Sequence, residues 1–287
     1  MLFVDELIEF TNARGLTVKL DGAPFGLVSV EGLGDVAADV QQQKAPYQDG
    51  TDFVDTVLEP RYISVEFIVR GDDYDEIKHH RAYLSGVLNP KLGLGTLRYI
   101  SGDVVRELKA VAESVPAFPD MEARGERWQR GLVMFVAPNP YWQDVNPINI
   151  KLEDYVANFS FPFSFPVTFS IRGDSRTIVN SGHAPTPIKV TFRGNSVNPK
   201  ITKNNTGEFI KVNRTIPEGY SLVITTDFNN KSVKIIAPDG VESNAMGYID
   251  LDSTFFSLDV GENHLSFITE GGKPEVFIEY RNLFIGV

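Results

Sequence analysis

The stretch "RYISVEFIVRG", residues 61–71, carries an apolar side chain at every second position. Ile63, Val65, Phe67 and Val69 therefore share one face of an extended strand, and the residues between them fall on the other face. This alternation predicts a β-strand that turns one face toward a core. The rest of the first half is built outward from it.

One helix is predicted directly after this strand, at about residues 73–88. Asp73 and Glu76 form a capping-box pattern, acidic residues fill the first turn, and Asn89-Pro90 ends the helix. The stripe expected on one helix face is Ile77, His80, Arg81, Leu84, Val87 and Leu88. Further strands are expected at 7–10 and 16–20, which the turn "NARG" (12–15) joins, and at 95–100, 104–112 and 127–138.

The segment "GDVAADVQQQKAPYQDGTDFVDT", residues 34–56, has little periodicity, a run of Gln and two turn signals, Ala45-Pro46 and Asp49-Gly50. A long loop inside a compact domain is usually either functional or disordered. We expect an extended, unstructured arm near residues 35–56 that contacts neighbouring subunits.

A different pattern follows the proline-rich stretch "APNPYWQDVNPIN" (137–149), which is typical of a linker between domains. Short alternating runs recur about every ten residues and are separated by turn clusters such as "SGHAPTP" and "APDG". The sequence thus predicts an α+β, mostly β fold. Residues 1–143 form a β domain with one helix, and residues 144–287 form an antiparallel β-sandwich.

Residues 158–171, "NFSFPFSFPVTFSI", alternate apolar side chains with Ser, Thr, Pro162 and Pro166. A single strand of this kind cannot build a membrane barrel, and Pro is confined to edge strands. We expect Phe159 to Ile171 to form the entry edge strand of the sandwich. In that position, Phe163→Ala or Phe169→Ala should each cost on the order of 3 kcal/mol.

Composition and charge exclude several classes of protein. The 287-residue chain has no Cys, its first residues are acidic where a secretory signal is basic, and it contains no apolar run long enough for a membrane helix. Of the net charge of −11, residues 1–150 carry −9. Such a surface repels phosphate, so stable nucleic-acid binding is not expected. Membrane insertion is not expected either, because no apolar run is long enough.

Sites for chemistry are not indicated. The four His residues (79, 80, 183 and 264) are scattered or adjacent on a helix, and metal-binding, nucleophile-elbow and phosphate-loop motifs are missing. We therefore expect no catalytic, metal or cofactor site. Two alternatives stay open: a carbohydrate-binding β-sandwich involved in host-surface recognition, although Trp128 and Trp142 both precede the sandwich, and an enzyme that uses two carboxylates.

Several motifs, taken in order, resemble one family. They are "YQDGTDF" (47–53), "RYISVEFIVRG" with its helix, "APNPYW" (137–142), the Phe/Pro alternation, "NSGHAPTPIKVTFRG" (180–194), "NNTGEFI" (204–210) and "FFSLDVGENHLSF" (255–267). Together they resemble the distal tail proteins of siphovirus-type long-tailed bacteriophages or prophages. The resemblance extends over nearly the whole chain.

The resemblance implies that the first domain forms a hexameric ring at the tail tip and that the second is a galectin-like sandwich. The ring would join the tail tube protein to hub or fibre proteins below it, and DNA would pass through. The chain would be a virion component assembled in the bacterial cytoplasm. The galectin-type sugar-binding residues do not carry over, so the sandwich is expected to be a docking module.

Three groups of residues are candidates for these roles. The candidate subunit-interface residues are Tyr47, Asp49, Gly50, Phe53 and Arg61. The candidate domain-junction residues are Pro140, Tyr141 and Trp142. A conduit should not hold its DNA, so an acidic or neutral lumen wall is expected. The candidate lumen residues, chosen because they lie in loops beside predicted strands, are Asp49, Asp52, Asp55, Asp72, Asp73 and Asp103.

Overall fold

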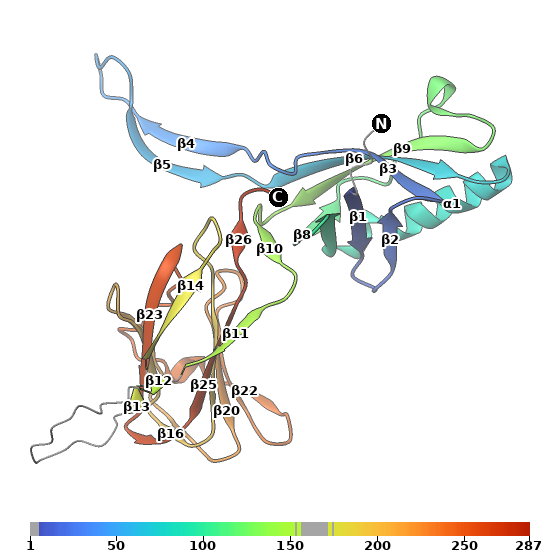
Figure 1. Cartoon of the computed structure of the whole chain (residues 1–287). Coiled ribbons are helices and arrows are strands. Elements are labelled where there is room, and N and C mark those ends of the chain that lie inside the picture. The colour runs from blue at the N-terminus through green and yellow to red at the C-terminus, as the bar shows by residue number, and fades with distance from the viewer. Residues whose placement is uncertain (1–5, 153, 156–171, 174) are drawn as a thin grey trace, which may run out of the picture. The chain divides into compact units, whose positions relative to one another are not determined.

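A computed structural model describes residues 6–152, 154–155, 172–173 and 175–287. The described residues form two compact units, residues 1–145 with 284–287 and residues 146–283. The chain therefore leaves the first unit, builds the second, and returns to the first for its last four residues (Figure 1). The predicted edge strand at 159–171 and the expected effects of its Phe substitutions lie outside the described residues.

The first unit contains two antiparallel sheets that share a strand. The first sheet runs in the order β2 (Thr17–Leu20), β1 (Glu6–Thr11), β7 (Gly95–Ser101), β8 (Val104–Ala112), β10 (Trp142–Asp144) and β26 (Leu283–Phe284). The second sheet runs β8, β9 (Trp128–Ala137), β6 (Arg61–Arg70) and β3 (Phe25–Glu31). Strand β8 takes part in both, because it pairs with β9 only at Val111 and Ala112.

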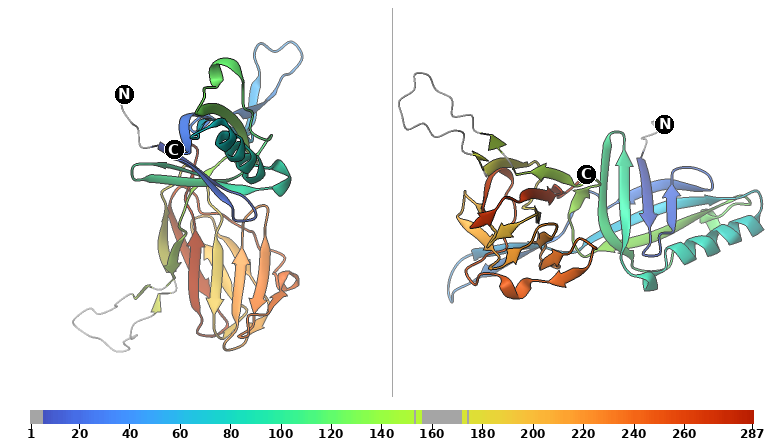
Figure 2. Two further views of the ribbon diagram at one scale, coloured as in Figure 1. Left: turned by 90° about the vertical axis from the view of Figure 1, so that its right-hand side faces the viewer. Right: turned by 90° about the horizontal axis from the view of Figure 1, so that it is seen from below.

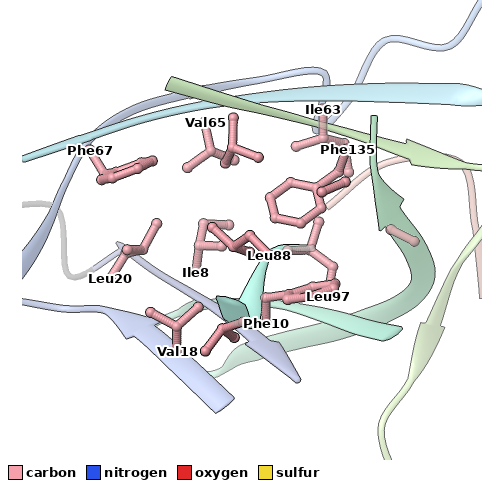
Figure 3. Close-up of a cluster of buried hydrophobic side chains, with 14 of the residues drawn as sticks. Ile8, Phe10, Val18, Leu20, Ile63, Val65, Phe67, Leu88, Leu97 and Phe135 are labelled. Carbon is pink, nitrogen blue, oxygen red and sulfur yellow. The ribbon is translucent and has the colours of Figure 1, made fainter. Parts of the chain in front are cut away.

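The core of this unit lies between the two sheets (Figure 3). Ile63, Val65 and Phe67 of β6 are fully buried, as the alternation predicted, and they face Ile8 and Leu20. Each such side chain contributes about 1.5–3 kcal/mol by leaving water.

The predicted helix is confirmed as α1 (Tyr74–Val87). The Asp73 carboxylate caps it by accepting from the Glu76 N–H at 2.8 Å, and Glu76 accepts from the N–H of Asp72. Of the predicted stripe, Ile77, Leu84 and Val87 are buried in the core, together with Leu88 just beyond the helix. Two short 3-10 turns, η1 (Pro90–Leu92) and η2 (Met121–Ala123), complete the helical part of this unit as described.

The segment predicted to be unstructured is instead a regular hairpin, which corrects the sequence-based expectation. Strands β4 (Ala38–Gln43) and β5 (Asp52–Leu58) pair with each other and extend beyond β3 and β6 (Figure 1). We call residues 35–58 the arm. It leaves β6 at the Arg61 end, whereas α1 follows the Arg70 end of the same strand.

The second unit is the predicted antiparallel sandwich, with two sheets face to face (Figure 2). One sheet has the order β11 (Ile148–Lys151), β25 (Glu275–Tyr280), β15 (Lys189–Arg193), β20 (Ser221–Thr225), β21 (Ser232–Ile236) and β22 (Glu242–Asn244). The other has the order β14 (Ser175–Asn180), β23 (Gly261–Ile268), β17 (Lys200–Lys203) and β18 (Glu208–Lys211). Val190, Phe192, Ile201 and Leu265 are among the buried residues that fill the space between them.

Smaller elements surround the sandwich. Strand β16 (Ser196–Val197) lies between β19 (Thr215–Ile216) and β24 (Gly271–Gly272), and β12 (Asp154–Tyr155) pairs with β13 (Arg172–Gly173). A 3-10 turn, η3 (Met246–Tyr248), follows β22. No helix in the described part of the chain is long and apolar enough to span a bilayer.

Candidate functional site

The arm has two chemically different faces. The register pairs Ala38 with Leu58, Val40 with Thr56 and Gln42 with Phe53, which places an apolar set on one face. The alternate pairs place three carboxylates on the other face, Asp39, Asp52 and Asp55, together with Gln41, Gln43 and Val57. We call these the apolar arm face (Ala38, Val40, Phe53, Leu58) and the acidic arm face (Asp39, Asp52, Asp55).

A β-bulge at Val54 preserves this division. The register shifts between Gln41 and Gln42, so that Val54 is an extra residue on β5. A bulge places two residues opposite one and so lets Phe53 return to the face of Val40. In the sequence, the same extra residue breaks the two-residue period, which is why sequence reasoning missed both faces and missed Val40 and Asp39.

The apolar arm face is open to solvent within the subunit. Val40 is 48% exposed and Phe53 is 67% exposed. A two-stranded hairpin with no cover is marginally stable in water. The arm therefore exposes an apolar surface that its own subunit does not cover.

The tip of the arm is an ordered turn. Gln48 closes it by accepting from the Ala45 N–H at 2.9 Å and donating to Asp52 at 3.2 Å. Tyr47 has a φ of 65°, an unfavourable region for a residue with a Cβ, and its side chain is fully exposed. Strained, ordered residues of this kind are concentrated at functional sites. The predicted interface residues Tyr47, Asp49 and Gly50 all lie in this turn.

Arg61, also predicted to face a neighbour, is buried instead, and this prediction is corrected. The side chain is 1% exposed and donates to five backbone carbonyls. The acceptors are Pro140 (2.7 Å), Gly32 (2.8 Å), Leu33 (3.0 Å), Asp35 (3.1 Å) and Ile285. Burial lowers the pKa of the Arg61 guanidinium, and the nearby Asp35 carboxylate partly offsets this effect.

The predicted junction residues Pro140 and Trp142 lie beside the Arg61 side chain at the base of the arm. Trp142 is fully buried and donates from its indole N–H to the Leu33 carbonyl at 3.0 Å. Pro140 is buried and supplies the carbonyl that Arg61 Nε binds, while Tyr141 is half-buried. Pro140 and Trp142 thus belong to the interior of the first unit and hold the base of the arm.

The six predicted lumen carboxylates are all exposed, but the structure does not bring them together. Asp49, Asp52 and Asp55 lie on the arm. Asp72 and Asp73 precede α1 at the other end of β6, a strand of ten residues that spans roughly 33 Å. Asp103 lies in the turn between β7 and β8.

Clusters suited to metal binding are not found among the residues described here. The features that stand out in the first unit are the hairpin arm with its exposed apolar face and the buried Arg61 side chain at its base.

Comparison with known proteins assigns the chain to a class. Residues 14–137 match the phage tail protein RIFT-related domain, and residues 181–284 match the C-terminal domain of the siphovirus-type tail component. No curated protein sequence matched. The protein is therefore a structural component of phage tails.

Solved structures share the fold. The crystal structure of SPP1 Dit, described as a hub of the adsorption apparatus in phages that infect Gram-positive bacteria, has 14% identity and a TM-score of 0.71, with 97% of this chain and 99% of that one covered. The phage p2 baseplate in its activated conformation, solved with Ca or with Sr, matches at 10% identity and a TM-score of 0.59, covering 98% and 99%. With both domain models, these findings place the chain in the siphovirus-type distal tail protein (Dit) family.

Proposed function

We propose that this tail component is a non-enzymatic hub whose first unit assembles into a hexameric ring at the tail tip. The ring joins the tail tube to the hub or fibre proteins below it and lets DNA pass. The observation that carries the proposal is the arm, which projects from its own subunit with an exposed apolar face. An arm of this form fits ring assembly, because it offers each subunit one surface to bury against another.

The mass in solution tests ring formation. Six copies of the 31.9 kDa chain give about 191 kDa, which light scattering or native mass spectrometry would resolve. Replacing residues 37–58 with a short Gly-containing turn should leave the second unit folded and abolish the oligomer. A monomer at every concentration of the intact chain would refute the ring.

DNA can pass through the proposed ring only if the lumen wall does not bind it tightly. We infer that the acidic arm face lines part of the lumen, with the other predicted carboxylates as further candidates. Carboxylates repel the phosphates, and the absence of Lys and Arg contacts avoids counterion release. The assembled protein should show no affinity for duplex DNA at moderate salt. Replacing Asp52 and Asp55 with Lys should create such affinity while the ring stays intact.

The second unit is proposed as a docking module for other tail-tip proteins, and the virion as the site of the assembled protein, built in the host cytoplasm. The alternative role, carbohydrate binding, predicts glycan affinity in a monomeric chain. A glycan array probed with the intact chain separates the two.

A further inference from the structure

The arm cannot bury its own apolar face. Only Glu59 and Pro60 connect β5 to β6, and the Glu59 N–H donates to the Ala37 carbonyl at 2.9 Å, which closes the hairpin at its base. On the other strand, Arg61 binds the carbonyls of Gly32, Leu33 and Asp35 just before β4 begins. These contacts tie both strands at the base of the arm, which extends beyond β3 and β6 and leaves its apolar face exposed.

A second apolar face lies on the body of the first unit. The outer side of β6 and β9 carries Tyr62 opposite Val136, Ser64 opposite Met134, and Glu66 opposite Leu132. Tyr62 is 54% exposed, Leu132 43% and Met134 36%. We call Tyr62, Leu132, Met134 and Val136 the outer sheet face.

The sequence of β9 agrees with a strand that is covered on both sides. Val133 and Phe135 point into the core, whereas Leu132 and Met134 point outward, so that both faces are apolar. Strands with solvent on one side normally alternate apolar and polar residues, and continuous apolar runs are typical of strands buried on both faces. The outer sheet face is therefore expected to be covered in the assembled state.

We propose that the apolar arm face of one subunit packs on the outer sheet face of a second copy of this chain. This inference rests on the proposed ring and adds the contact that builds it. Each chain offers two different surfaces, an arm and a sheet, so the contact is heterologous, which is the kind of contact that closes into a ring. Both surfaces are two strands wide, and Phe53 is the largest side chain of the arm face.

The contact also orients the rest of the arm. When Val40 and Phe53 are buried against the neighbour, Asp39, Asp52 and Asp55 necessarily turn away from it. The acidic arm face then stays in water, and the desolvation cost of burying carboxylates is avoided. The ion pair between Arg130 and Glu66, at 3.0 Å beside Leu132, lies at the polar rim of the same surface.

Engineered cysteines test the contact directly, because the natural chain has none. Phe53→Cys is combined in turn with Leu132→Cys and with Met134→Cys, and each protein is oxidised and run without reductant. A pair that comes within disulfide distance should give reducible covalent multimers. Asp55→Cys combined with the same partners is the matched control, since it lies on the opposite arm face, and it should give little cross-linking.

A mixing experiment tests whether the contact is heterologous. Phe53→Asp disables the arm and Met134→Asp disables the sheet, and each should weaken self-association by at least about tenfold. In an equal mixture, the Met134→Asp protein supplies an unchanged apolar arm face, and the Phe53→Asp protein supplies an unchanged outer sheet face. A pair of about 64 kDa should therefore form and grow no further. Asp55→Ser, on the acidic face, should assemble like the unchanged protein.

The outcomes separate this contact from the ring itself. An intact hexamer in both Asp variants, without cross-links from Phe53→Cys, would overturn the contact and leave the ring standing. Efficient cross-linking of Asp55→Cys would mean that the acidic face is the one that docks. A monomeric unchanged protein would overturn both the ring and the contact.

Discussion

Arg61 shows, at the scale of a single residue, how an isolated buried cation is accommodated. Its hydrogen-bond acceptors are the backbone carbonyls of Gly32, Leu33, Asp35, Pro140 and Ile285, and the Asp35 carboxylate acts on it through its charge. The planar guanidinium offers five N–H donors in a fixed fork, which an ammonium group cannot reproduce. Arg61 therefore sets where the arm begins.

Replacing Arg61 should be among the most damaging single changes in the first unit. Arg61→Met removes the Arg61 donors from the carbonyls of Gly32, Asp35, Pro140 and Ile285 and leaves the Leu33 carbonyl with Trp142 alone. The free energy of unfolding should therefore fall by about 3 kcal/mol. Arg61→Lys should recover only part of the loss. Chemical denaturation measures both. Arg130→Lys, at an exposed ion pair, is the control and should change stability by less than about 0.5 kcal/mol. An equally stable Arg61→Met protein would contradict this account.

At the scale of a single element, helix α1 gives different roles to the two adjacent carboxylates that precede it. Asp72 and Asp73 were both predicted to line a lumen, but Asp73 has a structural task as the N-cap of α1. Ala at an N-cap costs about 1 kcal/mol, so Asp73→Ala should lower the free energy of unfolding by that amount. Asp72→Ala should cost only a few tenths, because its side chain adds a charge near the helix dipole without capping it. Equal losses for the two variants would argue against the cap.

In the second unit, the Asp250 carboxylate accepts hydrogen bonds within a turn, and these predict that the stability of the fold depends on pH. The pKa of Asp250 is lowered, first by the hydrogen bond from the Asp252 N–H and then by the one from Asn213. A lowered folded-state pKa means that this stabilisation is complete above the unfolded-state value of about 4 and is lost as pH falls through the folded value. Asp250→Asn should therefore flatten the fall in melting temperature below pH 5. A parallel fall in both proteins would contradict this.

At the scale of the whole molecule, the chain crosses between its units twice. Residues 284–287 return to the first unit, where the Phe284 ring lies 3.8 Å from the Arg106 guanidinium and the Ile285 carbonyl accepts from Arg61. Four residues that follow the whole sandwich in sequence thus add contacts to the first unit, one of them at the base of the arm.

Deleting residues 284–287 should loosen the first unit and spare the second. Hydrogen exchange should speed up at 32–37 and at 140–144, whose groups share the Arg61 and Trp142 contacts, and stay unchanged in β15, β20 and β25. Phe284→Leu, which removes the ring stacked on Arg106 but keeps the backbone contacts, should have a smaller effect. Uniform acceleration across both units would show that the tail stabilises the molecule in some other way.

The sequence by itself determined strands β1, β2, β6, β7, β8 and β9, the helix with its cap, and the sandwich class of the second unit, because periodicity, capping and turn residues act over a few positions. It showed neither β3 nor the hairpin of the arm. It also carried enough ordered motifs to indicate the family. Tertiary structure alone decided the site. The bulge at Val54 restored an apolar arm face that the sequence pattern concealed, and Arg61 became a buried anchor because its acceptors lie up to 224 residues away in the chain. Such contacts leave no local period, so only the folded chain brings them together.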